Sequence, residues 1–478
     1  MHSAHWQATS EFSRGDQMNR LQEVREFELI TGSEAYRDRN IPGIRYCEFF
    51  YSLKNFVLEY STRNDDSDIL EFMKLGFKRN IGEYISIRNY VGVVQLRNGC
   101  QLQILPKIDF TAGDDQRATG TKKIFLKMLR CLKDFPCKKF SNAELAVDRL
   151  NLYEIFIRMF VEETAGLVKH GLKSAYIEKQ ENLTVYKGKL LVNSHIKHNA
   201  AHKERFFVEF DEYMLNRPEN RLIKSTLLTL LKQTSCGDTA KNIRRLLTAF
   251  ELVEPSACYE RDFSKVSIDR NTGEYEVLMK WAKVFLQHSS FTTFSGSGSA
   301  VSLLFPMEKV FESYVAAHLK KICAGKKMKI SVQDRCCYLF DRLNGEPYRK
   351  FALRPDIVIT GTGSSDCNRT ERIILDTKWK RLVNDRGRNY GISQADMYQM
   401  FAYSQKYQTS EIWLLYPLNN EMRNYETIKF ESTGSGGRIN CTVSVFFVDL
   451  ERIESSMQEL IEQIECSTPE THQNVRLQ

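Results

Sequence analysis

The chain has 478 residues, which is long enough for two or three domains that each bury a core of their own. Hydrophobic residues make up 42% of the sequence and charged residues 27%, and no uninterrupted apolar stretch has the length that a bilayer requires, so no contact with a membrane is expected. The formal net charge of +8 is mild for this length, but it favours a polyanionic partner such as nucleic acid.

The twelve cysteines are scattered along the chain without a Cys-x-x-Cys pair. This spacing is typical of reduced thiols rather than of disulfides or a structural zinc site. Only Cys441 and Cys466 follow the candidate site described below, which is too few ligands for an iron–sulfur cluster. The first residues lack a basic end followed by an apolar core, so we expect a cytoplasmic protein.

In chain order, residues 1–40 are polar and without periodicity, and we expect a mobile arm there. Residues 41–120 are predicted to form a small β-rich domain. Within it, alternating apolar residues in Tyr84–Ile108 flank Asn98-Gly99, whose tolerance of positive φ favours a tight hairpin. The polar segment Asp109–Thr121 is predicted to be a boundary loop.

Residues 121–288 are predicted to be mainly helical, because apolar residues recur at helical spacing in Leu152–Phe160 and in Leu222–Leu231. Between these stretches, the segment 186–205 mixes basic and aromatic residues. Such a mixture can track a phosphate backbone, although a solvated basic face is the commoner outcome. No cysteine or well-placed carboxylate completes a zinc site with the histidines of this region, which are His195, His198 and His202.

A Ser/Gly-rich stretch at residues 289–304 is predicted to be a linker or loop, and residues 305–466 are predicted to form a further domain. An apolar stripe predicts that its first helix covers Pro306–Ile322, with the proline in the first turn. Glu308 and Glu312 lie four residues apart on the rim of this helix. Either could therefore lean toward a nearby site, or simply face solvent beside lysines.

Two short apolar strands carry the most informative residues. Asp356 opens one strand after an Arg-Pro pair, and Asp376 and Lys378 close the other. Because side chains alternate along a strand, Asp376 and Lys378 are predicted to project from one face, with Thr377 and Trp379 pointing the other way. The polar, glycine-bearing segment between the strands predicts that they pair and bring Asp356 alongside Asp376.

These residue types suit phosphodiester hydrolysis with Mg²⁺. Hard oxygen ligands such as Asp356 and Asp376 hold this ion, which keeps several waters, polarises a phosphate and acidifies a bound water. Lys378 would orient that water or balance developing charge. Taken singly, each residue also fits a turn followed by a strand edge with alternating charges, and only the spaced triplet favours a metal-dependent nuclease.

A helix is predicted for Gln394–Gln408. Gln399 and Tyr403 are four residues apart in it and share a face with Asp396, one turn earlier. This helix therefore presents polar groups on one side.

Buried strands at Glu411–Tyr416 and Thr442–Val448 are predicted to complete a mixed sheet, and a helix at Glu451–Ile464 to close the domain. The polar tail at residues 467–478 is predicted to be disordered. The fold class expected from the whole pattern is α+β, with a β-rich N-terminal domain and a mostly helical middle region.

The order of these motifs resembles that of the PD-(D/E)XK nuclease superfamily: a glutamate on a helix, Arg-Pro-Asp, Asp-x-Lys on a strand, then Gln-x-x-x-Tyr on a helix. More narrowly, Phe305–Glu312, Leu375–Lys380 and Asp396–Tyr403 resemble the McrC family, the nuclease subunits of McrBC-type restriction systems. The likeness covers most of the chain from about residue 85 to 450, while the first 80 residues match weakly. Further matching segments are Gly99–Lys107, Tyr186–Leu190, His195–Asn199 and Asn220–Lys224.

The resemblance implies a C-terminal restriction-endonuclease-like α/β domain with Mg²⁺ as cofactor. The implied roles are metal binding by Asp356 and Asp376, catalysis by Lys378, support by an acid at Glu312, and positioning of the active site or DNA backbone by Gln399 and Tyr403. It also implies that the N-terminal part contacts a separate McrB-like AAA+ motor. No glycine-rich loop ends in Gly-Lys-Ser or Gly-Lys-Thr, so GTP is expected on that partner and not on this chain.

We therefore expect the DNA-cleaving endonuclease subunit of an McrBC-like restriction complex, which cuts double-stranded, methylcytosine-containing foreign DNA and is driven by a GTP-dependent translocating partner. One centre per chain favours pairing of two copies for cutting both strands. Two other classes stay open. A stand-alone repair or recombination nuclease would cut without nucleotide, and a non-catalytic adaptor would stimulate the motor GTPase and recruit another nuclease.

Overall fold

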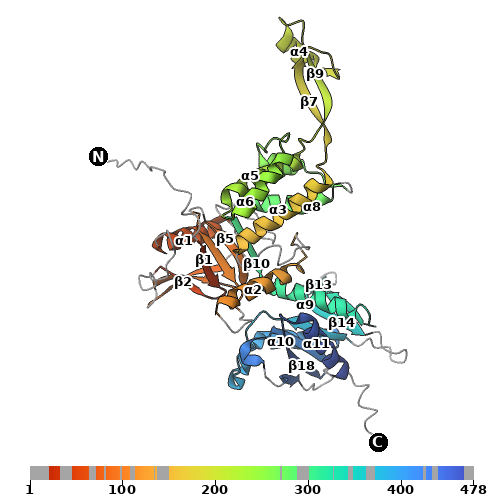
Figure 1. Cartoon of the computed structure of the whole chain (residues 1–478). Coiled ribbons are helices and arrows are strands. Elements are labelled where there is room, and N and C mark those ends of the chain that lie inside the picture. The colour runs from red at the N-terminus through yellow and green to blue at the C-terminus, as the bar shows by residue number, and fades with distance from the viewer. Residues whose placement is uncertain are drawn as a thin grey trace.

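The computed structural model describes an α+β protein with several sheets, one of them mixed (Figure 1). Residues 1–20 of the expected arm, 289–300 of the expected linker and the expected tail from 468 lie outside the described residues. No helix in the described part of the chain is long and apolar enough to cross a membrane. The described residues are 21–32, 46–63, 72–79, 82–96, 99–107, 114–133, 135–136, 150–269, 272–287, 301–326, 328–342, 348–361, 372–423, 427–432 and 440–467.

Two small sheets and helix α1 (Tyr46–Arg63) build the N-terminal part. Their apolar side chains enclose one core, to which Phe49, Ile85 and Leu102 belong. The first sheet has the order β1-β6-β5-β10, with strands at Leu21–Arg25, Gln101–Leu105, Tyr90–Gln95 and Val301–Pro306. The second has the order β2-β4-β3, with strands at Leu29–Thr31, Gly82–Ile87 and Met73–Lys78.

Strands β5 and β6 pair in antiparallel fashion, as the predicted hairpin requires, and Gly99 between them has a φ of 77°. Asn98, the other residue of the predicted turn, lies outside the described residues. The hairpin places a buried apolar strand, β5, at the centre of the first sheet, where it also receives β10.

Three expectations about this part are wrong. Residues 21–31 of the expected arm form β1 and β2, because each pairs with a strand far along the chain, which no local pattern reveals. Residues 114–121 of the expected loop form the first turns of helix α2 (Asp114–Leu129). Burial of Phe125 stabilises the later turns, and a helix extends readily from turns that are already formed. Residues 301–304 of the expected linker belong to β10, whose apolar side chains complete the first sheet.

The middle of the chain forms a helical body from which a long arm projects (Figure 1). Helix α3 ends before Gly171, as predicted. The helices are α3 (Leu152–His170), α5 (Pro218–Gln233), α6 (Gly237–Ala249), α7 (Tyr259–Ser264) and α8 (Glu274–Gln287). The arm consists of β7 (Ala175–Leu183), β8 (Lys189–Leu190), α4 (Val192–Asn199) and β9 (Phe206–Met214).

The basic and aromatic segment 186–205 lies on this arm, at the opposite end of the molecule from the C-terminal sheet (Figure 1). The ring of His195 stacks on Phe206, and the ring of His198 stacks on Phe207. Among the described residues, no group of three histidine, cysteine or acidic side chains is arranged to hold a metal ion. Two of the three histidines therefore contribute to packing within the arm.

A six-stranded mixed sheet forms the C-terminal part, with the order β11-β14-β15-β16-β18-β17. Strand β14 is antiparallel to β15, whereas β15, β16 and β18 are parallel. The strands are Met328–Val332, Ile357–Gly361, Arg372–Thr377, Glu411–Pro417, Cys441–Val448 and Lys429–Ser432 in that order. The remaining elements are the β12–β13 hairpin (Tyr338–Arg342 and Tyr348–Ala352), α9 (Met307–Cys323), α10 (Gln394–Tyr407), α11 (Ile453–Ser467) and two 3₁₀ helices, η4 (Arg386–Gly391) and η5 (Asn420–Met422).

Alternation along β15 separates the two faces of this sheet. Leu375 belongs to the core beneath α9 and α11, together with Phe311 of α9. Ile374 belongs to a second core on the other face, together with Met400 of α10. Asp376 has the same parity as Ile374, so it lies at the end of the strand on the side that α10 covers.

We expect Gly92→Ala to destabilise the protein. Gly92 in β5 has a φ of 145°, and an added Cβ would lie 1.8 Å from the carbonyl oxygen of Leu303 in β10. The two strands must then separate, so the free energy of unfolding should fall by roughly 2–3 kcal/mol, measured by thermal or denaturant unfolding. Gly166→Ala in α3 is the matched control, since its methyl meets nothing within 4 Å and alanine favours a helix. Equal stability of both variants would contradict the β5–β10 contact.

Candidate active site

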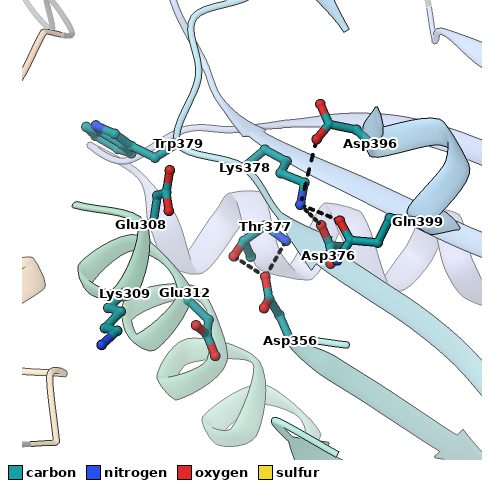
Figure 2. Close-up of a pocket in the computed structure, with 10 residues that line it drawn as sticks. All are labelled: Glu308, Lys309, Glu312, Asp356, Asp376, Thr377, Lys378, Trp379, Asp396 and Gln399. Atoms are coloured by element: carbon teal, nitrogen blue, oxygen red, sulfur yellow. Dashed lines mark hydrogen bonds and ion pairs between the residues drawn. The ribbon is translucent and has the colours of Figure 1, made fainter. Parts of the chain in front are cut away.

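The register of β14 against β15 brings three charged side chains together (Figure 2). Ile357 pairs with Leu375, so Asp356, just before β14, lies alongside Asp376 in β15. The Nζ atom of Lys378 is 2.8 Å from Oδ2 of Asp376. The three residues that the sequence predicted to converge therefore do so.

Thr377 holds the Asp356 carboxylate. Its backbone N–H and its hydroxyl donate to Oδ2 of Asp356, with donor–acceptor distances of 2.8 and 2.7 Å. Alternation along the strand predicted that Thr377 points away from the site. However, the pairing of β14 with β15 ends at Ile357. The Thr377 N–H therefore donates to the side chain of Asp356 and not to a backbone carbonyl. Two short hydrogen bonds thus fix Oδ2 of Asp356 and orient its carboxylate.

The Lys378 ammonium is placed by two elements. It forms an ion pair with Asp376 of β15 and donates to Oε1 of Gln399 in α10 at 3.0 Å. Nε2 of Gln399 in turn donates to the hydroxyl of Tyr403 at 2.8 Å, across one turn of the helix. Asp396 is farther away, with Oδ1 4.0 Å from Nζ of Lys378. Of the predicted pair, Gln399 therefore contacts Lys378 directly, and Tyr403 is connected to Lys378 through Gln399.

Helix α9 brings two glutamates to the opposite side of the site. Gln333 connects Glu312 to the carboxylates, because its Nε2 donates to Glu312 Oε1 at 2.7 Å and to Asp356 Oδ1 at 3.3 Å. Glu308 instead accepts a hydrogen bond from Nδ2 of Asn89 at 3.0 Å, and so leans toward the N-terminal sheet. Of the two candidates, Glu312 is the one linked to Asp356, through Gln333.

These side chains enclose a cavity of about 310 Å³, drawn in Figure 2. Because β15 ends at Thr377, strict alternation stops there, and four consecutive residues from Asp376 to Trp379 all reach the cavity. The lining residues are Glu308, Lys309, Glu312, Asp356, Asp376, Thr377, Lys378, Trp379, Asp396 and Gln399.

Burial and mutual repulsion perturb the acids of this cavity. Burial raises the pKa of Asp376 to about 7, and the nearby Asp356 carboxylate adds to the rise. Burial likewise raises the pKa of Glu312 to about 7, again with a contribution from Asp356. Burial lowers the pKa of Lys378, but attraction to Asp376 outweighs this effect and raises it, so the amine stays charged. Five carboxyl groups but only two lysines, Lys309 and Lys378, line the cavity, so acidic groups outnumber the ammonium groups.

A divalent cation bound by oxygen fits this donor set. Oδ2 of Asp376 is enclosed and receives no hydrogen bond of good geometry, only the ion pair with Lys378. Mg²⁺ is usually held by one or two carboxylates and several waters, so Asp356 and Asp376 meet its needs. A closed zinc site does not fit, since the described residues offer no set of three suitable ligands.

Sequence reasoning missed Gln333 and the site-facing side of Thr377. Gln333 follows β11 with a φ of 53°, and its backbone N–H donates to the carbonyl of Asp356 at 2.9 Å. No local pattern singles out a glutamine after an edge strand. The threonine between Asp376 and Lys378 was visible, but its role depends on where the β14 ladder ends.

Two carboxylates and a lysine at the ends of two neighbouring interior strands of a mixed sheet form an acidic site on an α+β fold. A family model described as "McrBC 5-methylcytosine restriction system component" matches residues 85–417. Since the match spans most of the chain, this protein belongs to that family of restriction-system components.

A solved structure shares this fold. A chain from the refined half-complex of the tetradecameric assembly of Thermococcus gammatolerans McrB AAA+ hexamers with bound McrC matches with a TM-score of 0.66 at 18% identity, covering 93% of this chain and 100% of that chain. A chain of the Thermococcus gammatolerans McrBC complex matches with a TM-score of 0.43 at 23% identity, covering 62% and 85%. No curated protein matches this chain.

We expect the metal-free protein to lose stability as the pH rises from about 5 to 8. The folded pKa values of Asp376 and Glu312 are about 7, above their ordinary values, so the folded state retains protons that the unfolded chain has released. Asp376→Asn removes one such group, and at pH 8 it should raise the unfolding temperature by roughly 2–4 °C.

Scanning fluorimetry from pH 5 to 8, with and without Mg²⁺, measures this effect. Mg²⁺ should stabilise the wild type at pH 8 but not the Asp376→Asn variant. Glu462→Gln, at an exposed position of α11, is the control and should follow the wild type. A wild-type unfolding temperature that rises steadily to pH 8 would show that these carboxyls ionise freely.

Proposed function

We propose that this chain is the DNA-cleaving subunit of an McrBC-like restriction complex and hydrolyses phosphodiester bonds in duplex DNA. The observation that carries the proposal is the convergence of Asp356, Asp376 and the Lys378 ammonium on one cavity. Family membership supports a restriction-system role, and the chemistry of the three groups supports a nuclease of the PD-(D/E)XK type.

Asp356 and Asp376 would hold Mg²⁺, which supplies Lewis-acid polarisation of the phosphate and a more acidic bound water. The hydrogen bonds from Thr377 to Oδ2 and from Gln333 to Oδ1 keep the Asp356 carboxylate in one orientation, so it is preorganised to hold the ion. Lys378 stays charged beside Asp376, where it orients an attacking water and balances the negative charge that develops on the phosphate.

Three further side chains support this centre. Gln399, itself held by Tyr403, accepts a hydrogen bond from the Lys378 ammonium and limits its rotation. Glu312 adds a carboxylate on the α9 side, and Gln333 joins it to Asp356. We assign Glu312 the role of supporting acid, since Glu308 is bonded to Asn89 instead.

We also propose a AAA+ GTPase partner, because the similar structure from Thermococcus gammatolerans is described as McrB AAA+ hexamers with bound McrC. The partner would bind GTP and translocate DNA, and the β-rich part within residues 41–120 would contact it. Methylcytosine-containing foreign DNA is the substrate that the family description supports. We place the complex in the cytoplasm, with two copies pairing to cut both strands.

Alanine at Asp356, Asp376 or Lys378 should each lower the DNA cleavage rate by roughly 100-fold or more, since charge stabilisation at the reacting phosphate is lost. Gel assays of plasmid cleavage by the assembled complex with Mg²⁺ measure the rate, and co-purification with the motor measures assembly. Lys321→Ala is the control, because Lys321 pairs with Glu454 at the exposed surface of α9. Retained cutting by any of the three site variants counts against the proposal.

Cleavage should require both the AAA+ partner and GTP, and methylated DNA should be cut faster than unmodified DNA. The four combinations of partner and GTP, each tested on both substrates, measure this. Cutting by the isolated chain without nucleotide would favour a stand-alone repair nuclease. GTP turnover by the complex without any nicking would favour a non-catalytic adaptor that recruits another nuclease.

A further inference from the structure

The end of the catalytic strand is attached to the N-terminal sheet by a buried polar contact. Trp379 follows Lys378 directly, is 3% exposed, and lines the cavity. Its indole Nε1 donates to both carboxylate oxygens of Glu26, at 3.2 and 3.0 Å. Glu26 comes just after β1 and is also 3% exposed. A residue of the first sheet thus binds the neighbour of the active-site lysine.

Lys107, just beyond β6, binds the same two residues. Its backbone N–H donates to Oε2 of Glu26 at 3.0 Å, and its Nζ donates to the carbonyl oxygen of Trp379 at 2.9 Å. The ammonium also lies 4.4 Å from the centroid of the Phe27 ring. Because Lys107 bonds to the main chain of Trp379, it fixes the backbone next to Lys378 and not only an aromatic ring.

Helix α9 completes this contact. The rings of Phe311 and Trp379 have centroids 5.5 Å apart, and Phe311 directly precedes Glu312. On the same helix, Glu308 accepts a hydrogen bond from Asn89, which lies between β4 and β5. The N-terminal sheet therefore touches both sides of the cavity, at Trp379 and at Glu308.

Holding the N-terminal sheet against the end of β15 does not require buried charged groups such as Glu26 and Lys107. Burial raises the pKa of Glu26 to about 7 and lowers that of Lys107, so both groups are held at an energetic cost. Apolar side chains would join the two parts more cheaply, whereas directed hydrogen bonds select one geometry. That geometry matters here, because Lys378 follows the end of β15. Its backbone is held by its N–H, which donates to the carbonyl of Leu415 in β16 at 2.9 Å, and by its carbonyl, which accepts from the Lys380 N–H at 2.9 Å.

We infer that Glu26 and Lys107 are positioning residues for cleavage, which act through Trp379 to hold the Lys378 ammonium in place beside Asp376. The inference rests on the proposed nuclease function. On this inference the N-terminal sheet helps to form the active site. A partner bound to this sheet would be connected to Lys378 through Glu26 and Lys107, which bind Trp379.

The test uses the full chain assembled with its motor, Mg²⁺ and GTP on methylated duplex DNA. Lys107→Met keeps the aliphatic stem but loses the donor, and Trp379→Phe keeps the ring beside Phe311 but loses the indole N–H. Both should lower the cleavage rate at saturating DNA by roughly 10- to 100-fold, since small displacements of catalytic groups have effects of this size. The DNA concentration for half-maximal rate should stay within about twofold of the wild type.

Two further variants separate positioning from folding. Lys54→Met is the matched control, because Lys54 in α1 pairs with Glu83 of β4 at 2.7 Å away from the cavity, and it should cut at the wild-type rate. Glu26→Gln keeps an acceptor for the indole and should retain most of the activity, whereas Glu26→Leu should match Trp379→Phe.

Unfolding temperatures are measured on every variant. Wild-type rates in Lys107→Met and Trp379→Phe would overturn the inference, as would losses that the folded fraction fully explains or equal losses in Glu26→Gln and Glu26→Leu. A wild-type complex that fails to cut, with normal assembly, would instead overturn the proposed function on which the inference rests.

Discussion

The antiparallel pairing of β14 with β15 is the constraint on which the site depends. A shift of one residue would turn Asp376 and Lys378 toward the opposite core and separate them from Asp356. Two features keep the register: the apolar residues of both strands divide between the cores on the two faces, and Thr377 bonds to the Asp356 side chain. The same pairing therefore stabilises the sheet and assembles the carboxylates.

Helices α9 and α10, on the two faces of the sheet, contribute differently to the charges around β14 and β15. Helix α10 offers a neutral amide, Gln399, to the ammonium of Lys378, and its capping box at Ser393 fixes where the helix begins. Helix α9 offers a further carboxylate, Glu312, which adds to the repulsion among buried acids. In this arrangement the buried carboxyl groups repel one another, while Lys378 places a positive charge beside Asp376.

Sequence alone could predict those parts of the site that follow a fixed period. Asp376 and Lys378 are two residues apart at the end of a strand, and Gln399 and Tyr403 are four apart on a helix, so spacing predicts that each pair shares a face. It could not predict that Thr377 and Trp379 also reach the cavity, because alternation stops where β15 ends. Contacts between distant segments leave no such period. Gln333 and the strand β1, which pairs in parallel with β6, could not be found, because their partners are determined only when the whole sheet forms.

Strand β10 ends at Pro306 and helix α9 begins at Met307, so no connecting residue separates the first sheet from the helix that carries Glu312. Met307 also donates its N–H to the carbonyl of Asn89, which ties the first turn back to the sheet. A strand and a helix joined in this manner have no connecting loop that could absorb a displacement of the first sheet. Movement of β10 would therefore be passed directly to the start of the helix that carries Glu312.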